Sequence, residues 1–191
     1  NFTMQANNAI ERISAVLEAP VLRDAAVIEH PSGSSISFEH VSFRYENSKI
    51  DALNDLSFAI PAGSTVALVG PSGGGKTTAA SLVPRFWDVS AGRVLVGGVD
   101  VRNIAQSDLM NQVAFVFQNN RLFKGSILDN VRAARPEASR EEALDALRAA
   151  QCDDILLKMP NGADELIGPG GPYLSGGEVQ RIALARAILK N

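Results

Sequence analysis

The sequence has almost no cysteine, no long apolar run and no excess of basic residues. Cys152 is the single cysteine among 191 residues, which excludes an intrachain disulfide and fits a reducing compartment. No apolar stretch reaches the roughly 18 residues that a membrane-spanning helix needs, and no signal-peptide pattern opens the chain. The formal net charge is −3. A nucleic-acid-binding domain needs a basic face, so we expect no nucleic-acid partner.

An amphipathic segment opens the chain. Apolar residues recur at helical spacing between Phe2 and Leu17, and Pro20 ends the pattern, which predicts a helix. An irregular linker over residues 20–35 follows. Taken alone, such a helix is typical of a docking element.

Strand-like runs occupy the next part of the sequence. The runs at 35–45, 52–60, 93–101 and 112–117 predict strands, and the first alternates as a half-buried antiparallel strand does. The run at 64–70 is continuously apolar instead, which is typical of a parallel strand covered on both faces. The two kinds together predict a mixed α/β sheet.

Helical patterns dominate after residue 121. Ser139 and Glu142 form a capping box ahead of a helix, and a shorter helix over 153–159 stops at Pro160. A last helix starts at Ser175 and runs to the end of the chain.

A glycine-rich loop interrupts the apolar run at 64–70. Residues 70–77 read GPSGGGKT and fit G-x-x-x-x-G-K-[ST] between a strand and a helix that begins near Gly75. Inward backbone N–H groups make an anion-binding nest that side chains would block, and the helix start adds a positive end. Lys76 supplies a point charge for the β and γ phosphates, and the Thr77 hydroxyl can bind Mg²⁺. The alternative, a chance glycine-rich turn, leaves the flanking strand and helix unexplained. The loop therefore predicts a nucleoside triphosphate site.

A second glycine cluster, LSGGEVQR at 174–181, also opens a helix. Ser175 and Glu178 fit a capping box, but this leaves Gly176 and Gly177 unexplained. Each glycine costs the first turn up to ~1 kcal/mol against alanine. We infer that something approaches this backbone closely, and that this is a second phosphate-facing helix start at which Ser175 donates to an anion. Two such helix starts on one domain indicate nucleotides held between two copies.

The two motifs together resemble the Walker A loop and the signature motif of ATP-binding cassette (ABC) ATPases. The resemblance covers nearly the whole chain. It implies an α/β P-loop NTPase fold with a RecA-like core, an antiparallel β subdomain and an α-helical subdomain over about 121–174. Residues 35–191 would form the ATP-binding domain. Residues 1–34 resemble the end of the last transmembrane helix and the linker of exporter-type half-transporters, and LFKGSILDNV at 122–131 resembles an exporter segment.

The resemblance also assigns roles to single residues. Tyr45 lies where the family's aromatic residue stacks on adenine, although its position fits a strand core residue equally well. Gln118 resembles the Q-loop glutamine, which touches Mg²⁺ or the attacking water. ATP and Mg²⁺ are therefore the expected cofactors, with Lys76 and Gln118 as catalytic residues and Thr77 and Gln118 as metal ligands. The expected nucleotide-binding set is Tyr45, Gly70, Pro71, Ser72, Gly73, Gly74, Gly75, Lys76, Thr77, Thr78, Gln118, Ser175, Gly176, Gly177 and Glu178.

The function that the resemblance implies is the ATP-binding domain of an exporter-type ABC transporter, which couples ATP binding and hydrolysis to solute movement. Its expected partners are a second ABC cassette, identical or different, arranged head to tail, and a transmembrane domain on the same chain. The expected location is the cytoplasmic face of the cell membrane.

The sequence departs from the family in what it lacks. A Walker B aspartate, a catalytic glutamate and a switch histidine are absent, and the family would enter the Walker B strand after Asn191. Asp100, His30 and His40 all lie too early in the chain. Loss of the general base costs a factor of about 10²–10⁴ in rate, so we expect this polypeptide to bind ATP better than it hydrolyses it. Pro169 replaces an acidic residue of exporters and leaves the coupling contact open.

Alternative functions are a soluble ABC ATPase of translation or DNA repair and a non-hydrolysing cassette of a heterodimeric transporter. The LSGGEVQR motif disfavours an unrelated P-loop kinase.

Overall fold

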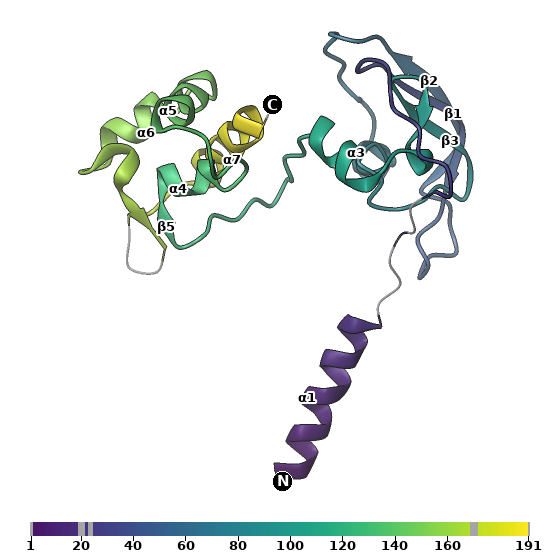
Figure 1. Cartoon of the computed structure of the whole chain (residues 1–191), viewed down its shortest axis with the longest axis horizontal. Coiled ribbons are helices and arrows are strands. Elements are labelled where there is room, and N and C mark those ends of the chain that lie inside the picture. The colour runs from purple at the N-terminus through teal and green to yellow at the C-terminus, as the bar shows by residue number, and fades with distance from the viewer. Residues whose placement is uncertain (1, 19–21, 23–24, 169–171, 191) are drawn as a thin grey trace. The chain divides into compact units, whose positions relative to one another are not determined.

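The computed structural model describes residues 2–18, 22, 25–168 and 172–190, so Pro20 and Pro169 lie outside the described residues. The chain folds as two compact units, Asn1–Ala105 and Gln106–Asn191 (Figure 1). The predicted first helix is confirmed as α1 (Phe2–Leu17). Within the described residues, the structure contains no helix that combines the length and the apolar character needed to cross a bilayer.

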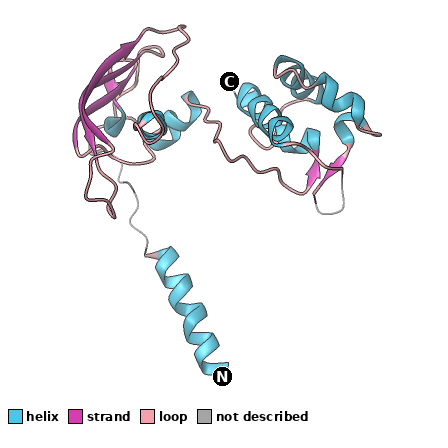
Figure 2. Cartoon of the chain, turned by 180° about the vertical axis from the view of Figure 1, so that it is seen from behind, coloured by secondary structure: helices cyan, strands magenta, loops and turns pink. Residues whose placement is uncertain are grey.

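The first unit is built on a four-stranded antiparallel sheet, drawn in magenta in Figure 2. Its order is β2 (Leu53–Ile60), β1 (Ile36–Phe43), β3 (Ala91–Val96) and β4 (Val99–Asp100), followed by a 3₁₀ turn at Val101–Asn103. Phe38, Val41 and Phe43 of β1 are buried, and the polar residues between them are more exposed. The alternation in the sequence therefore predicted these strands correctly.

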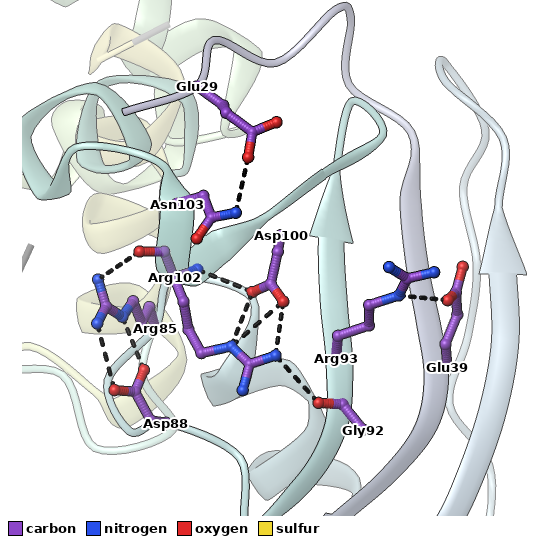
Figure 3. Close-up of polar contacts among 9 residues, drawn as sticks. All are labelled: Glu29, Glu39, Arg85, Asp88, Gly92, Arg93, Asp100, Arg102 and Asn103. Carbon is purple, nitrogen blue, oxygen red and sulfur yellow. Dashed lines mark hydrogen bonds and ion pairs between the residues drawn. The ribbon is translucent and has the colours of Figure 1, made fainter. Parts of the chain in front are cut away.

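A polar network ties the chain that follows helix α2 (Lys76–Leu82) to this sheet (Figure 3). Arg85 is almost fully buried and pairs with Asp88, with Nε–Oδ1 at 2.7 Å, and its Nη1 donates to the carbonyl of Arg102. Arg102 pairs in turn with Asp100 and donates to the carbonyl of Gly92 on β3. Charge-assisted pairs of this kind fix geometry. The network therefore anchors the end of α2 to β3 and β4.

The runs at 64–70 and 112–117 do not form strands, so the prediction of strands there is wrong for this structure. Val66 and Leu68 are partly exposed, and Val69 is 92% exposed. A parallel strand is stable only between hydrogen-bonded neighbours. Among the described residues neither segment has such a neighbour, and an apolar pattern alone does not supply one.

The second unit is mainly helical. Its elements are α3 (Gln106–Gln112), β5 (Gly125–Ser126), α4 (Ile127–Arg132), α5 (Arg140–Ala149), α6 (Asp153–Lys158), a 3₁₀ turn at Gly162–Asp164, β6 (Leu166–Ile167) and α7 (Gly176–Lys190). Ser139 and Glu142 cap α5 as predicted, and Ser126 with Asp129 forms a further box at α4. Cys152 is fully buried, and burial raises the pKa of its thiol to about 11, so it is a core residue.

Candidate functional site

The glycine loop acquires its shape from residues in the left-handed region. Gly73 and Gly75 have φ values of 79° and 78°, which L side chains rarely adopt. A Cβ on Gly75 would also lie 2.5 Å from the carbonyl oxygen of Ala52. The loop therefore requires glycine at these two positions, and helix α2 begins directly after it at Lys76.

The start of α2 has no side-chain cap and carries a cation. Gly75 occupies the N-cap position without a side-chain hydrogen bond, so the first amides of the helix have no capping acceptor. The Lys76 ammonium lies back over the loop and donates to the carbonyls of Gly70, at 3.0 Å, and Pro71, at 2.7 Å. The Thr77 side chain is exposed beside it. Backbone N–H groups, a helix start and an ammonium together form a site suited to phosphate.

Tyr45 is joined to the same helix. Its hydroxyl lies 3.0 Å from the Oγ1 of Thr78, which is 7% exposed. The ring makes edge contacts with Phe43, at 4.8 Å between centroids, and with Trp87, at 5.4 Å. A cavity of about 600 Å³ lies beside these rings. Tyr45 is thus held by packing on two sides and by one hydrogen bond, and remains partly exposed.

The start of α7 has a different construction. The backbone N–H of Ser175 and its hydroxyl both donate to Oε2 of Glu178, at 2.8 and 2.9 Å, and the Glu178 N–H donates back to the Ser175 hydroxyl. These bonds, together with Lys158, lower the pKa of Glu178 to about 2. A Cβ on Gly176 or Gly177 would meet nothing within 4 Å. The described fold therefore does not itself require glycine there.

These features match one known family. The family model described as ABC transporter matches residues 53–191. The chain belongs to the ABC transporter family. Its residues 53–191 therefore carry the ATP-binding domain of that family, which binds nucleotide.

Several ABC proteins are similar to the chain. YgaD of Bacillus subtilis (strain 168), whose name describes a multidrug export ATP-binding/permease protein, is 44% identical over 156 residues, covering 82% of this chain and 27% of YgaD. The ATP-dependent lipid A-core flippase of Escherichia coli (strain K12) is 43% identical over 186 residues, covering 96% of this chain and 32% of the flippase. The chain thus spans about a third or less of the length of these relatives.

A solved structure is similar to nearly the whole of this chain. A bacterial Atm1-family ABC exporter with ATP bound superimposes with a TM-score of 0.85 and 35% identity, covering 98% of this chain and 34% of that one. This likeness confirms the predicted ABC ATPase fold. It also extends across both compact units of the chain.

The structure brings together part of the predicted ABC site. Tyr45 and the loop with Lys76, Thr77 and Thr78 belong to the first unit. Gln118 and the residues that open α7 belong to the second unit, where Gln118 is exposed. Two residues that contact the predicted site residues, Trp87 and Lys158, were not predicted from the sequence. The adjacent aromatic residues Phe86 and Trp87, a few positions after α2, were a signal for the first, whereas no local pattern indicates Lys158.

Proposed function

We propose that this ABC domain binds Mg²⁺·ATP and couples its binding and hydrolysis to solute export across a membrane. The observation that carries the proposal is the start of α2, where left-handed glycines, uncapped amides and Lys76 meet. Because Tyr45 bonds to Thr78 on the same helix, an aromatic ring lies close to this phosphate-type site.

The residues of this chain would divide the work as follows. The loop amides and Lys76 would hold the β and γ phosphates, with the ammonium exchanging its two loop carbonyls for phosphate oxygens. Tyr45 would stack on adenine, and the exposed Thr77 hydroxyl fits Mg²⁺, which favours oxygen ligands shared with phosphates and waters. Gln118 would act on the metal or the attacking water. Among the described residues no three acidic, histidine or cysteine side chains form a metal cluster, which agrees with an ion held largely by the nucleotide.

The partners we propose are a second cassette and a transmembrane domain. The open space at Gly176 and Gly177 supports a second copy, because within the described part of the chain a Cβ at either position would meet no atom within 4 Å. In a head-to-tail pair the start of α7 would face the nucleotide held by the partner copy. ATP would close the pair because it makes more contacts in the closed state. Similarity to an exporter and a flippase supports a fused membrane domain and a location at the cytoplasmic face of the membrane.

The test is Mg²⁺·ATP binding by the full-length protein with Lys76→Ala. Loss of a charge-assisted contact predicts a Kd about 10- to 100-fold higher. Lys124→Ala is the matched control, because Lys124 is an exposed lysine of the second unit. Equal affinity of the Lys76 variant and wild type would overturn the proposed site. ATP turnover is measured in parallel. We expect the 191 residues alone to bind ATP but to hydrolyse it poorly, because they contain no counterpart of the family's catalytic glutamate.

A further inference from the structure

Lys158, the last residue of α6, contacts the start of α7. Its ammonium lies 2.9 Å from Oε1 of Glu178, while Oε2 of the same carboxylate accepts both bonds from Ser175. The Glu178 side chain is 13% exposed, whereas that of Lys158 is 61% exposed. One carboxylate therefore serves two partners, with one oxygen in the capping box and the other on a lysine from a different helix.

The capping box could be closed without this charge. Glutamine at the third helical position completes the same box as glutamate does. Glutamate instead places a full negative charge in the first turn of α7, and the low pKa of Glu178 keeps it ionised at neutral pH. An anion there stabilises an isolated helix, but it repels a second anion that approaches the same N–H groups.

Lys158 is placed to cancel this charge. The nearby Arg181 adds only longer-range attraction, since its guanidinium forms a bidentate pair with Asp154 at 2.7 and 2.9 Å and also donates to the carbonyl of Gln151. Lys158 lies 4.0 Å from the same Asp154, farther than from Glu178. Among the described residues, Lys158 is the cation that forms an ion pair with Glu178. We propose that Lys158 is a positioning residue that neutralises Glu178 so that the start of α7 can accept a nucleotide phosphate. This inference rests on the proposed function, in which that helix start faces ATP.

The experiment measures steady-state ATPase activity of the full-length protein with Mg²⁺·ATP. Lys158→Met removes the ion-pair partner of Glu178, so the KM for ATP should rise about three- to fivefold, the size of a charge effect at a helix end, with a smaller change in kcat. The increase should shrink at high salt, because added ions screen the repulsion. Arg140→Met is the matched control. It breaks the exposed pair of Arg140 with Asp164 in the same unit and should leave the KM unchanged.

The decisive variant is the pair Lys158→Met with Glu178→Gln. If the lysine acts through charge, Lys158→Met should change the KM less than twofold once Glu178 is already glutamine. A salt bridge that only stabilises the fold would lower the melting temperature without this KM pattern. An unchanged KM in Lys158→Met, or an equal rise in both backgrounds, overturns the inference. The proposed function is judged separately by Lys76→Ala, which tests ATP binding at the other helix start.

Discussion

The starts of α2 and α7 differ in their capping and in the charge beside it. At α2, Gly75 provides no side-chain acceptor and the adjacent charge is the ammonium of Lys76. At α7, Ser175 and Glu178 close a capping box and the adjacent charge is a carboxylate. The first start is therefore ready to receive an anion, whereas the second already holds one.

The glycines at the two helix starts also differ, in whether the chain itself requires them. Gly75 is required by its own backbone angle and by the close carbonyl of Ala52. At Gly176 and Gly177 an added Cβ would have open space among the described residues. A phosphate site can thus be built by one chain at α2. At α7 the described residues give no reason for glycine, and in the proposed arrangement that start would serve a nucleotide held by a second copy.

The largest expected effect comes from placing alanine at both helix starts. Gly75→Ala forces a Cβ into the left-handed region and against a backbone oxygen, so we expect α2 to lose about 2 kcal/mol or more of stability. Gly176→Ala meets no neighbour and should stabilise the first turn of α7 by up to ~1 kcal/mol. Amide hydrogen exchange in the full-length protein measures both changes. Exchange should be faster in α2 of Gly75→Ala and slower in α7 of Gly176→Ala.

The sign of the two effects is what matters. If Gly176→Ala also accelerated exchange in its helix, the glycine would be required by the fold, and the contrast between the two starts would disappear. If Gly176→Ala slows amide exchange in α7 but weakens ATP binding or turnover, the glycine is needed there for an approaching group.

A smaller effect is expected from Tyr45→Phe, which sharpens the contrast by removing a side-chain hydrogen bond that supports α2. The variant keeps the ring and deletes the hydroxyl bonded to Thr78. We expect α2 to lose about 0.5–1.5 kcal/mol. The low end is favoured because a helical threonine can bond instead to a carbonyl one turn earlier. Amide exchange of α2 measures the loss.

Tyr173→Phe is the matched control for this change. Tyr173 is 90% exposed, so loss of its hydroxyl should leave the exchange of α2 unaltered. ATP affinity should change little in Tyr45→Phe, because the stacking surface is retained. A large loss of affinity would instead mean that the hydroxyl itself positions the nucleotide.

Local chemistry explains what the sequence could predict. The glycine loop, the capping boxes at Ser139 and Ser175 and the alternating strands all depend on residues a few positions apart. The failures depend on distant partners. The apolar run at 64–70 predicts burial, but a strand also needs a hydrogen-bonded neighbour.

The same limit applied inside the candidate site. Tyr45 and Thr78 are separated by a strand and the glycine loop, and Lys158 and Glu178 lie on different helices. Their pairing follows from how the elements pack, which a single sequence does not reveal. Trp87 was visible as an aromatic residue, but its contact with Tyr45 was not.

The smallest expected effect is that of protonating Glu178. Protonation removes the negative charge from the start of α7 and so makes it more like the start of α2. The pKa of Glu178 is lowered to about 2, first by the Ser175 backbone N–H and then by Lys158 and the Ser175 hydroxyl. The folded pKa is below the unfolded one, so the stabilisation is complete above about pH 4.5 and is lost as the pH falls toward about 2. Carboxyl chemical shifts should report this low pKa. Lys158→Met should raise it only partway, because the Ser175 amide still favours the ionised form. An unchanged pKa in Lys158→Met would mean that the capping box alone holds the charge.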